Sequence, residues 1–108
     1  MSKCIIKENG DKKWYLNSEL HREDGPAIEY KNSKKEWWLN GKIHRGDGPA
    51  IVWPDGSKQW WINGHLHRVD GPAIDASTGF KRWYLHGKEY TRDEFILLQF
   101  TKGIIINE

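Results

Sequence analysis

Apolar and polar residues along this chain follow a unit of 23 residues that is written four times without an insertion. In the second unit, residues 35–39 form an aromatic-rich run typical of a strand. Residues 50–53 form a second apolar segment, and Pro49 takes the first strand position, where proline is tolerated. This periodicity predicts one supersecondary unit stacked on copies of itself.

Asn-Gly pairs indicate how each unit turns. Asn40-Gly41 follows the aromatic run, and Asn-Gly is the favoured two-residue type I′ hairpin turn. Asn63-Gly64 repeats it, while Asn17-Ser18 and His86-Gly87 are weaker versions. The turn sets the register of the second unit, so we expect three cross-strand pairs: Trp38 with Ile43, Trp37 with His44, and Glu36 with Arg45.

The units together predict a mostly β protein: a curled antiparallel β-meander of four 23-residue hairpin repeats with a short C-terminal capping helix. We expect one domain over residues 1–108. Its segments are an N-terminal capping strand at 1–8, repeats at 9–31, 32–54, 55–77 and 78–90, and a C-terminal helix and tail at 91–108.

The helix is predicted from a capping box, with Thr91 as the N-cap and Glu94 three residues later. We expect it to run from residue 92 to about residue 100 and to end near Gly103. Residues 103–106 would then add a closing strand. The side chains expected to pack the helix on the sheet are Ile96, Leu97 and Phe100.

Composition limits the function classes. The formal net charge of +2 is too small to indicate a nucleic-acid partner. Cys4 is the single cysteine, so there is neither an intrachain disulfide nor a thiolate metal cluster. No apolar run is long enough to span a bilayer, and the default expectation is a cytoplasmic protein without a cofactor.

Histidine and aspartate recur at the repeat spacing as His-x-x-Asp. A row of metal or general-base sites is one interpretation, but two ligands in each unit are too few for a metal. A histidine that faces a tryptophan across a hairpin, with an aspartate or a carbonyl as its partner, is more often structural, and we favour that interpretation. The pairs are His21 and Asp24, His44 and Asp47, and His67 and Asp70.

Three arginines, also one repeat apart, give the best functional signal. We expect them to form a ladder beside an aromatic column, with Glu36 as the one carboxylate supplied across the hairpins. An under-neutralised arginine row next to aromatic faces suits an acidic protein surface, a nucleotide or a single strand, although a structural role is favoured over binding. The predicted binding residues are Arg22, Arg45, Arg68, Tyr15, Trp38, Trp61 and Tyr84.

The segment Asp-Gly-Pro-Ala recurs at residues 24–27, 47–50 and 70–73. It has one glycine and no following Lys-Ser or Lys-Thr, so it is no phosphate-binding loop, and we interpret it as a turn. No serine, cysteine or histidine constellation breaks the repeat symmetry, so no catalytic or metal-binding residue is predicted and the chain is not expected to be an enzyme.

Residues 38–44, continued to the Asp-Gly pair at 55–56, resemble the MORN repeat (membrane occupation and recognition nexus). The His-Arg-x-Asp-Gly-Pro-Ala form is similar to a longer variant in short repeat proteins of bacteria, tailed phages and large DNA viruses. The resemblance implies a non-catalytic scaffold that binds another protein, and a phage origin would imply an inhibitor of a host defence protein. The alternative is binding or sequestration of an anionic small molecule such as a nucleotide signal. An uncovered sheet edge would also allow chains to pair with one another.

Overall fold

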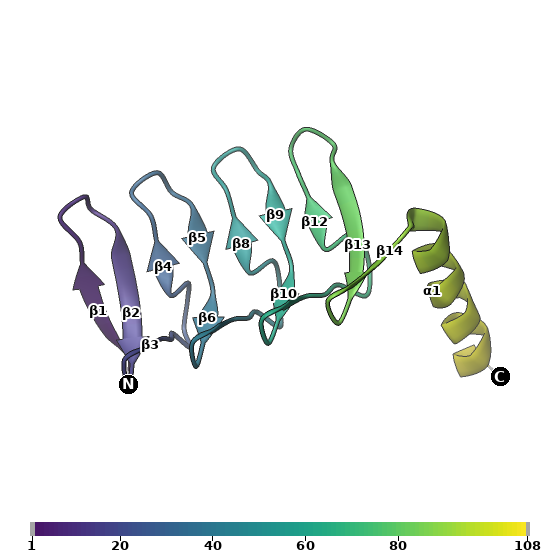
Figure 1. The fold of residues 1–108 in the computed structure, drawn as a ribbon, viewed down its shortest axis with the longest axis horizontal. Helices are drawn as coiled ribbons and strands as arrows, with labels where there is room; N and C mark the ends of the chain where they lie inside the picture. The colour runs from purple at the N-terminus through teal and green to yellow at the C-terminus, as the bar shows by residue number, and fades with distance from the viewer. Residues whose placement is uncertain (1, 108) are drawn as a thin grey trace.

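A computed structural model describes the backbone of residues 2–107 and the side chains of residues 2–100. Met1 and Glu108, which we assigned to the N-terminal strand segment and the C-terminal tail, lie outside this part. The described chain forms antiparallel hairpins in a row, with a helix at the C-terminal end (Figure 1). In chain order the elements are β1 (Lys3–Ile6), β2 (Lys12–Leu16), β3 (Glu19–Leu20), β4 (Ile28–Glu29), β5 (Lys35–Glu36), β6 (Trp38–Leu39), β7 (Lys42–Ile43), β8 (Ile51–Val52), β9 (Lys58–Gln59), β10 (Trp61–Ile62), β11 (His65–Leu66), β12 (Ile74–Asp75), β13 (Lys81–Leu85), β14 (Lys88–Tyr90) and α1 (Arg92–Asn107).

Most strands join one meandering sheet in the order β1-β2-β4-β5-β8-β9-β12-β13-β14, with β3 paired to β2. β6 pairs with β7 and β10 with β11 as separate short hairpins. The sheet does not close on itself, and the molecule measures 53 × 31 × 19 Å, which is thin for its length (Figure 1). The predicted fold class, a mostly β meander of hairpin repeats with a short C-terminal helix, is confirmed.

The Asn-Gly hairpins form as predicted. Asn40 and Gly41 both have positive φ, at 49° and 75°, as a type I′ turn requires. Trp38 lies opposite Ile43, and the backbone N–H of His44 donates to the carbonyl of Trp37 at 3.0 Å. Two of the three predicted cross-strand pairs are therefore confirmed.

The third pair, Glu36 with Arg45, is wrong. Glu36 lies in the ladder between Ile28 and Ile51, whereas the N–H of Arg45 donates to the carbonyl of Trp61 in the next unit. The reason is a change of partner at Trp37, whose N–H donates to Ala50 while its carbonyl still accepts from His44. Beyond that residue the two arms of the hairpin separate: Glu36 pairs with Ile28 and Ile51, whereas Arg45 pairs with the next unit.

Histidine side chains join successive units. In each case the Nδ1 atom accepts the backbone N–H of the next hairpin turn at 2.9 Å. The three pairs are His21 with Asn40, His44 with Asn63, and His67 with His86. The structural interpretation of this column is confirmed, although the partner is a backbone donor of the neighbouring unit and not an aspartate or a carbonyl acceptor.

The core is small and is built from the last residue of each Asp-Gly-Pro-Ala segment. Ala27, Ala50 and Ala73 are fully buried. In the middle of the sheet Ala50 clusters with Ile43 and Ile51, and four tryptophans pack against this cluster: Trp37, Trp38, Trp53 and Trp61. Because each unit buries so little by itself, contacts between neighbouring units carry much of the stability.

The capping box of α1 is confirmed. The N–H of Thr91 donates to the Glu94 carboxylate at 2.8 Å, and the N–H of Glu94 donates to the Thr91 hydroxyl at 3.1 Å. Phe95 is buried behind this first turn. The helix start was therefore predictable from four residues of sequence.

The rest of the helix differs from the prediction. It continues through Gly103 to Asn107, so the closing strand at residues 103–106 is wrong. Glycine in a helix costs about 1 kcal/mol relative to alanine, which is too little to end α1 at residue 103. Ile96, Leu97 and Phe100 are exposed, because α1 lies at the end of the sheet beside β13 and β14 and does not cover a face (Figure 1).

The turn between β4 and β5 carries a strained residue. Ser33 has φ of 79°, whereas the other three units place glycine at this position, as in Gly56 with φ of 91°. We expect Ser33→Gly to raise the free energy of unfolding by about 0.5–1 kcal/mol. The measurement is urea unfolding followed by tryptophan fluorescence.

The reverse change, Gly56→Ser, is the matched test, because a Cβ atom at this glycine has open space around it. It should lower stability by a similar amount. Equal stability of both variants and the parent chain would show that the turn is not strained.

The histidine links predict graded losses of stability. We expect His21→Ala to lower the free energy of unfolding by about 2 kcal/mol, because the side chain is buried and its hydrogen bond is lost. His44→Ala, at a more exposed copy of the link, should cost about 1 kcal/mol. The exposed His65, outside this column, is the control for urea unfolding, and losses no larger than that of His65→Ala would contradict the linking role.

Candidate functional site

The three predicted arginines stack on tryptophan rings, but not on the expected ones. The guanidinium carbon of Arg22 lies 3.9 Å from the ring centroid of Trp14, with Arg45 over Trp37 at 3.9 Å and Arg68 over Trp60 at 3.7 Å. Trp14 and Tyr15 are consecutive in β2, and successive strand side chains point to opposite faces. The arginines therefore lie on the face opposite Tyr15, Trp38, Trp61 and Tyr84, and the predicted site is divided between the two faces of the sheet.

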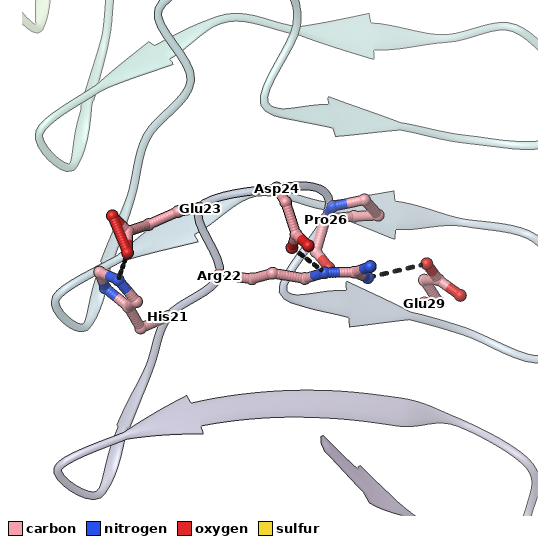
Figure 2. Close-up of polar contacts among 6 residues, drawn as sticks. All are labelled: His21, Arg22, Glu23, Asp24, Pro26 and Glu29. Atoms are coloured by element: carbon pink, nitrogen blue, oxygen red, sulfur yellow. Dashed lines mark hydrogen bonds and ion pairs between the residues drawn. The ribbon is translucent and has the colours of Figure 1, made fainter. Parts of the chain in front are cut away.

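Each arginine is also neutralised within its own loop. Arg22 Nε donates to Asp24 at 2.8 Å, and its Nη1 donates to the carbonyl of Pro26 and to Glu29, both at 3.2 Å (Figure 2). Arg45 and Arg68 repeat the first two contacts. The expectation of an under-neutralised row is wrong, because the carboxylate comes from the Asp-Gly-Pro-Ala segment, which we had interpreted as a turn only.

The glycine of that segment makes room for the guanidinium. A Cβ atom built on Gly25, Gly48 or Gly71 would lie only 2.9–3.1 Å from the arginine Cζ atom. None of the three has a positive φ, so space for the guanidinium group, and not backbone freedom, explains the glycine at this position. The arginine side chain is thus held between a tryptophan ring and a glycine backbone.

This geometry gives the face an acidic rim. The side chain of Asp47 is 88% exposed, whereas that of its partner Arg45 is 25% exposed. The hydrogen bond and charge of Arg22 hold the pKa of the Asp24 carboxyl below its ordinary value. The surface therefore presents ionised carboxylates to solvent while the guanidinium groups lie beneath them.

Two equivalent grooves cross this surface, which we call the Arg–Trp face. The first, of about 610 Å³, is bounded by the loops at residues 22–25 and 44–47 and contains Trp37 and Leu39. The second, of about 570 Å³, lies one unit further and contains Trp60 and Ile62. Gly46 and Asp47 border both grooves. The predicted binding residues did not include Trp37, Trp60, Gly46 or Asp47. The tryptophans and the Arg-x-Asp spacing recur every 23 residues, and this recurrence is the signal that could have found them.

The aromatic column on the opposite face is half-buried and partly occupied by hydrogen bonds. Trp38 Nε1 donates to the buried Glu36 at 2.9 Å, and Trp61 Nε1 donates to Gln59 at the same distance. Glu36 also accepts from the Tyr30 hydroxyl and pairs with Lys34, both at 3.2 Å. Burial, and next the Glu36 charge, raise the pKa of Tyr30 to about 12. Tyr15 and Tyr84 continue the column at its two ends, each half-buried.

Other chemistries find little support in the described part of the chain. Within it, no group of three or more histidine, cysteine, aspartate or glutamate residues is placed to hold a metal ion. Of its helices, none has the length and apolar character needed to cross a bilayer. Comparison with protein-family models, with curated proteins and with solved structures found no match to this chain. The likeness to MORN repeats therefore stays a prediction from sequence.

The Asp24–Arg22 pair predicts an acid dependence of stability. Because the folded-state pKa of Asp24 lies below the unfolded value of 3.8, the ionised carboxylate favours the folded state above that value. This contribution is lost as the pH falls through the lower folded-state pKa. We expect the melting temperature of Asp24→Asn to fall less steeply below about pH 4 than that of the parent chain.

Asp55→Asn is the comparison variant, since hydrogen bonds from Ser57 and Ser77 also lower the pKa of Asp55. With either substitution, the melting temperature should fall less steeply with decreasing pH below about pH 4 than that of the parent chain. Parallel curves for Asp24→Asn and the parent chain would contradict the assigned role of the pair.

Proposed function

We propose that this protein is a non-catalytic module that binds another protein on the Arg–Trp face. The observation that carries the proposal is the pair of near-identical grooves that share Gly46 and Asp47. Each groove combines an aromatic ring, an aliphatic side chain and an ion-paired arginine, and tryptophan and arginine are enriched at protein interfaces. A site that occurs twice in copied form suits repetitive binding better than catalysis by a unique residue set.

The charges favour a protein partner over an anionic ligand. Arg22, Arg45 and Arg68 already donate to carboxylates and to proline carbonyls, so their strongest donors are occupied. Exposed carboxylates at the rim, among them Glu23 and Asp24, would repel a nucleotide. We therefore propose a partner with apolar side chains for the grooves and basic groups for the rim. The nucleotide-signal alternative stays a prediction with less support.

The finer expectations rest on the sequence alone. A phage origin, inhibition of a host defence protein and a cytoplasmic location follow from the family resemblance and from composition. They stay predictions, and the grooves are compatible with them without favouring them.

Gly46→Trp tests the proposed surface. The φ of Gly46 is not positive, and a Cβ atom built on this residue would meet nothing within 4 Å. A side chain is therefore accommodated there without strain. The other units place Glu23 and Val69 at this position. We expect Gly46→Trp to keep the melting temperature while blocking both grooves, with at least a ten-fold loss of partner capture from host extract measured by quantitative proteomics.

Two controls define the result. Gly46→Val copies Val69 of the third unit and should retain most binding. Thr78→Trp places the same bulky ring on the exposed turn between β12 and β13 and should retain all of it. A partner that is captured equally well by Gly46→Trp and by the parent chain would refute binding on the Arg–Trp face.

A further inference from the structure

Each of the first three units contains the same strand pair. In each one a lysine-bearing strand accepts a strand with the sequence Pro-Ala-Ile followed by one more residue. Isoleucine lies opposite the residue after the lysine, and the next residue lies opposite the lysine itself. In two of the three pairs that residue is acidic, since Lys12 faces Glu29 and Lys58 faces Asp75.

β13 is a fourth copy of the accepting strand, but its added strand is missing. Lys81 and Arg82 stand one repeat beyond Lys58 and Gln59 and pair with β12 on one side. Thr91 and Glu94 replace the arginine and glycine of the motif, and α1 begins where the loop would lie. Within the described residues, no strand pairs with the other side of β13 at these two positions.

Backbone contacts show that this edge is open. The N–H of Ala76 donates to the carbonyl of Phe80, and backbone groups alternate sides along an antiparallel strand, so those of Lys81 point away from β12. The carbonyl of Lys81 accepts from the Arg82 guanidinium at 2.9 Å, a side-chain donor in the place of a ladder partner. An exposed side chain is readily displaced by a pairing strand.

A groove of about 440 Å³ lies beside this edge, between β13 and the first turn of α1. Its far wall includes Thr91, Arg92 and Glu94, at the start of α1. Lys81, Arg82 and Arg92 line the groove together with the carboxylates of Glu89 and Glu94, and Lys81 is also paired with Asp75.

We propose that the β13 edge takes up an extended segment of a partner protein as an added antiparallel strand. The segment has a small residue, then isoleucine, then an acidic residue. Isoleucine lies opposite Arg82 and the acidic side chain opposite Lys81, as in the strand pairs within the first three units of this chain. Strand addition of this kind obtains affinity from backbone hydrogen bonds and specificity from alternate side chains. The site is separate from the grooves of the Arg–Trp face and does not depend on their function.

The chain itself supplies the probe. A blocked peptide with the sequence of residues 24–30, Asp-Gly-Pro-Ala-Ile-Glu-Tyr, carries the strand that pairs with β2 in the first unit. In a two-dimensional NMR titration of the full protein up to millimolar peptide, we expect saturable shifts of Lys81, Arg82 and the first turn of α1. Replacing the peptide isoleucine by lysine should abolish them. Absence of shifts, or shifts centred on β1 or on the grooves, would overturn the proposal.

Charge reversal tests the register. Lysine in place of the peptide glutamate puts like charges opposite each other and should weaken binding about five-fold. The protein variant Lys81→Glu should restore binding of that lysine peptide and weaken binding of the original one. Lys81→Gln is the second variant, because Lys81 also pairs with Asp75 at 2.7 Å, and it should make the two peptides bind equally. Unchanged peptide preference in both variants would refute the register.

A second copy of the chain is the competing occupant. Residues 4–6 of β1, Cys-Ile-Ile, align with Ala-Ile-Glu of β4, and Ile5 and Ile6 are exposed. We expect the protein to sediment as a monomer, because β1 continues through a tight hairpin into β2 and is already paired with it. A concentration-dependent dimer that is lost in both Ile5→Lys and Lys81→Glu would assign the edge to self-association and refute the partner segment.

Discussion

The structure depends on a guanidinium group held between an indole ring and a glycine backbone. A sheet one layer thick buries few side chains, so the tryptophan face of each unit needs a cover. Arginine provides it with stacking that is worth up to about 2 kcal/mol when it is desolvated. The same side chain binds the aspartate and the proline carbonyl of its loop, and this fixes the path by which the following alanine reaches the core. Structure and candidate binding surface therefore share the same residues.

The elements set by local chemistry were predictable from sequence. Asn40-Gly41 defines its turn and register, the four-residue capping box defines the start of α1, and the repeat spacing shows that units stack side by side. The structural role of the histidines was also predictable, because the same side chain recurs in three of the four units. The turn and the capping box depend on residues within a few positions of one another, whereas the stacking and the histidines are indicated by recurrence every 23 residues.

The partners of the arginines were not predictable from hairpin register. That register extends only as far as Trp37, where the chain changes its pairing partner, and simple extrapolation put Arg45 opposite Glu36. A glycine interpreted as a turn residue proved to be a space requirement, which is visible only when the guanidinium is placed. The end of α1 was missed for a similar reason, since glycine propensity is too weak to decide where a helix stops.

The histidine links have a consequence for how the chain acquires its structure. Each one joins residues 19 positions apart, and the hairpins between them close over shorter distances. Proteins dominated by such sequence-local contacts have low contact order, because each contact closes a short loop and loses little chain entropy when it forms. A nascent polypeptide with this arrangement can order its first hairpins while the later ones are still being synthesised, and each completed unit is the template on which the next one folds.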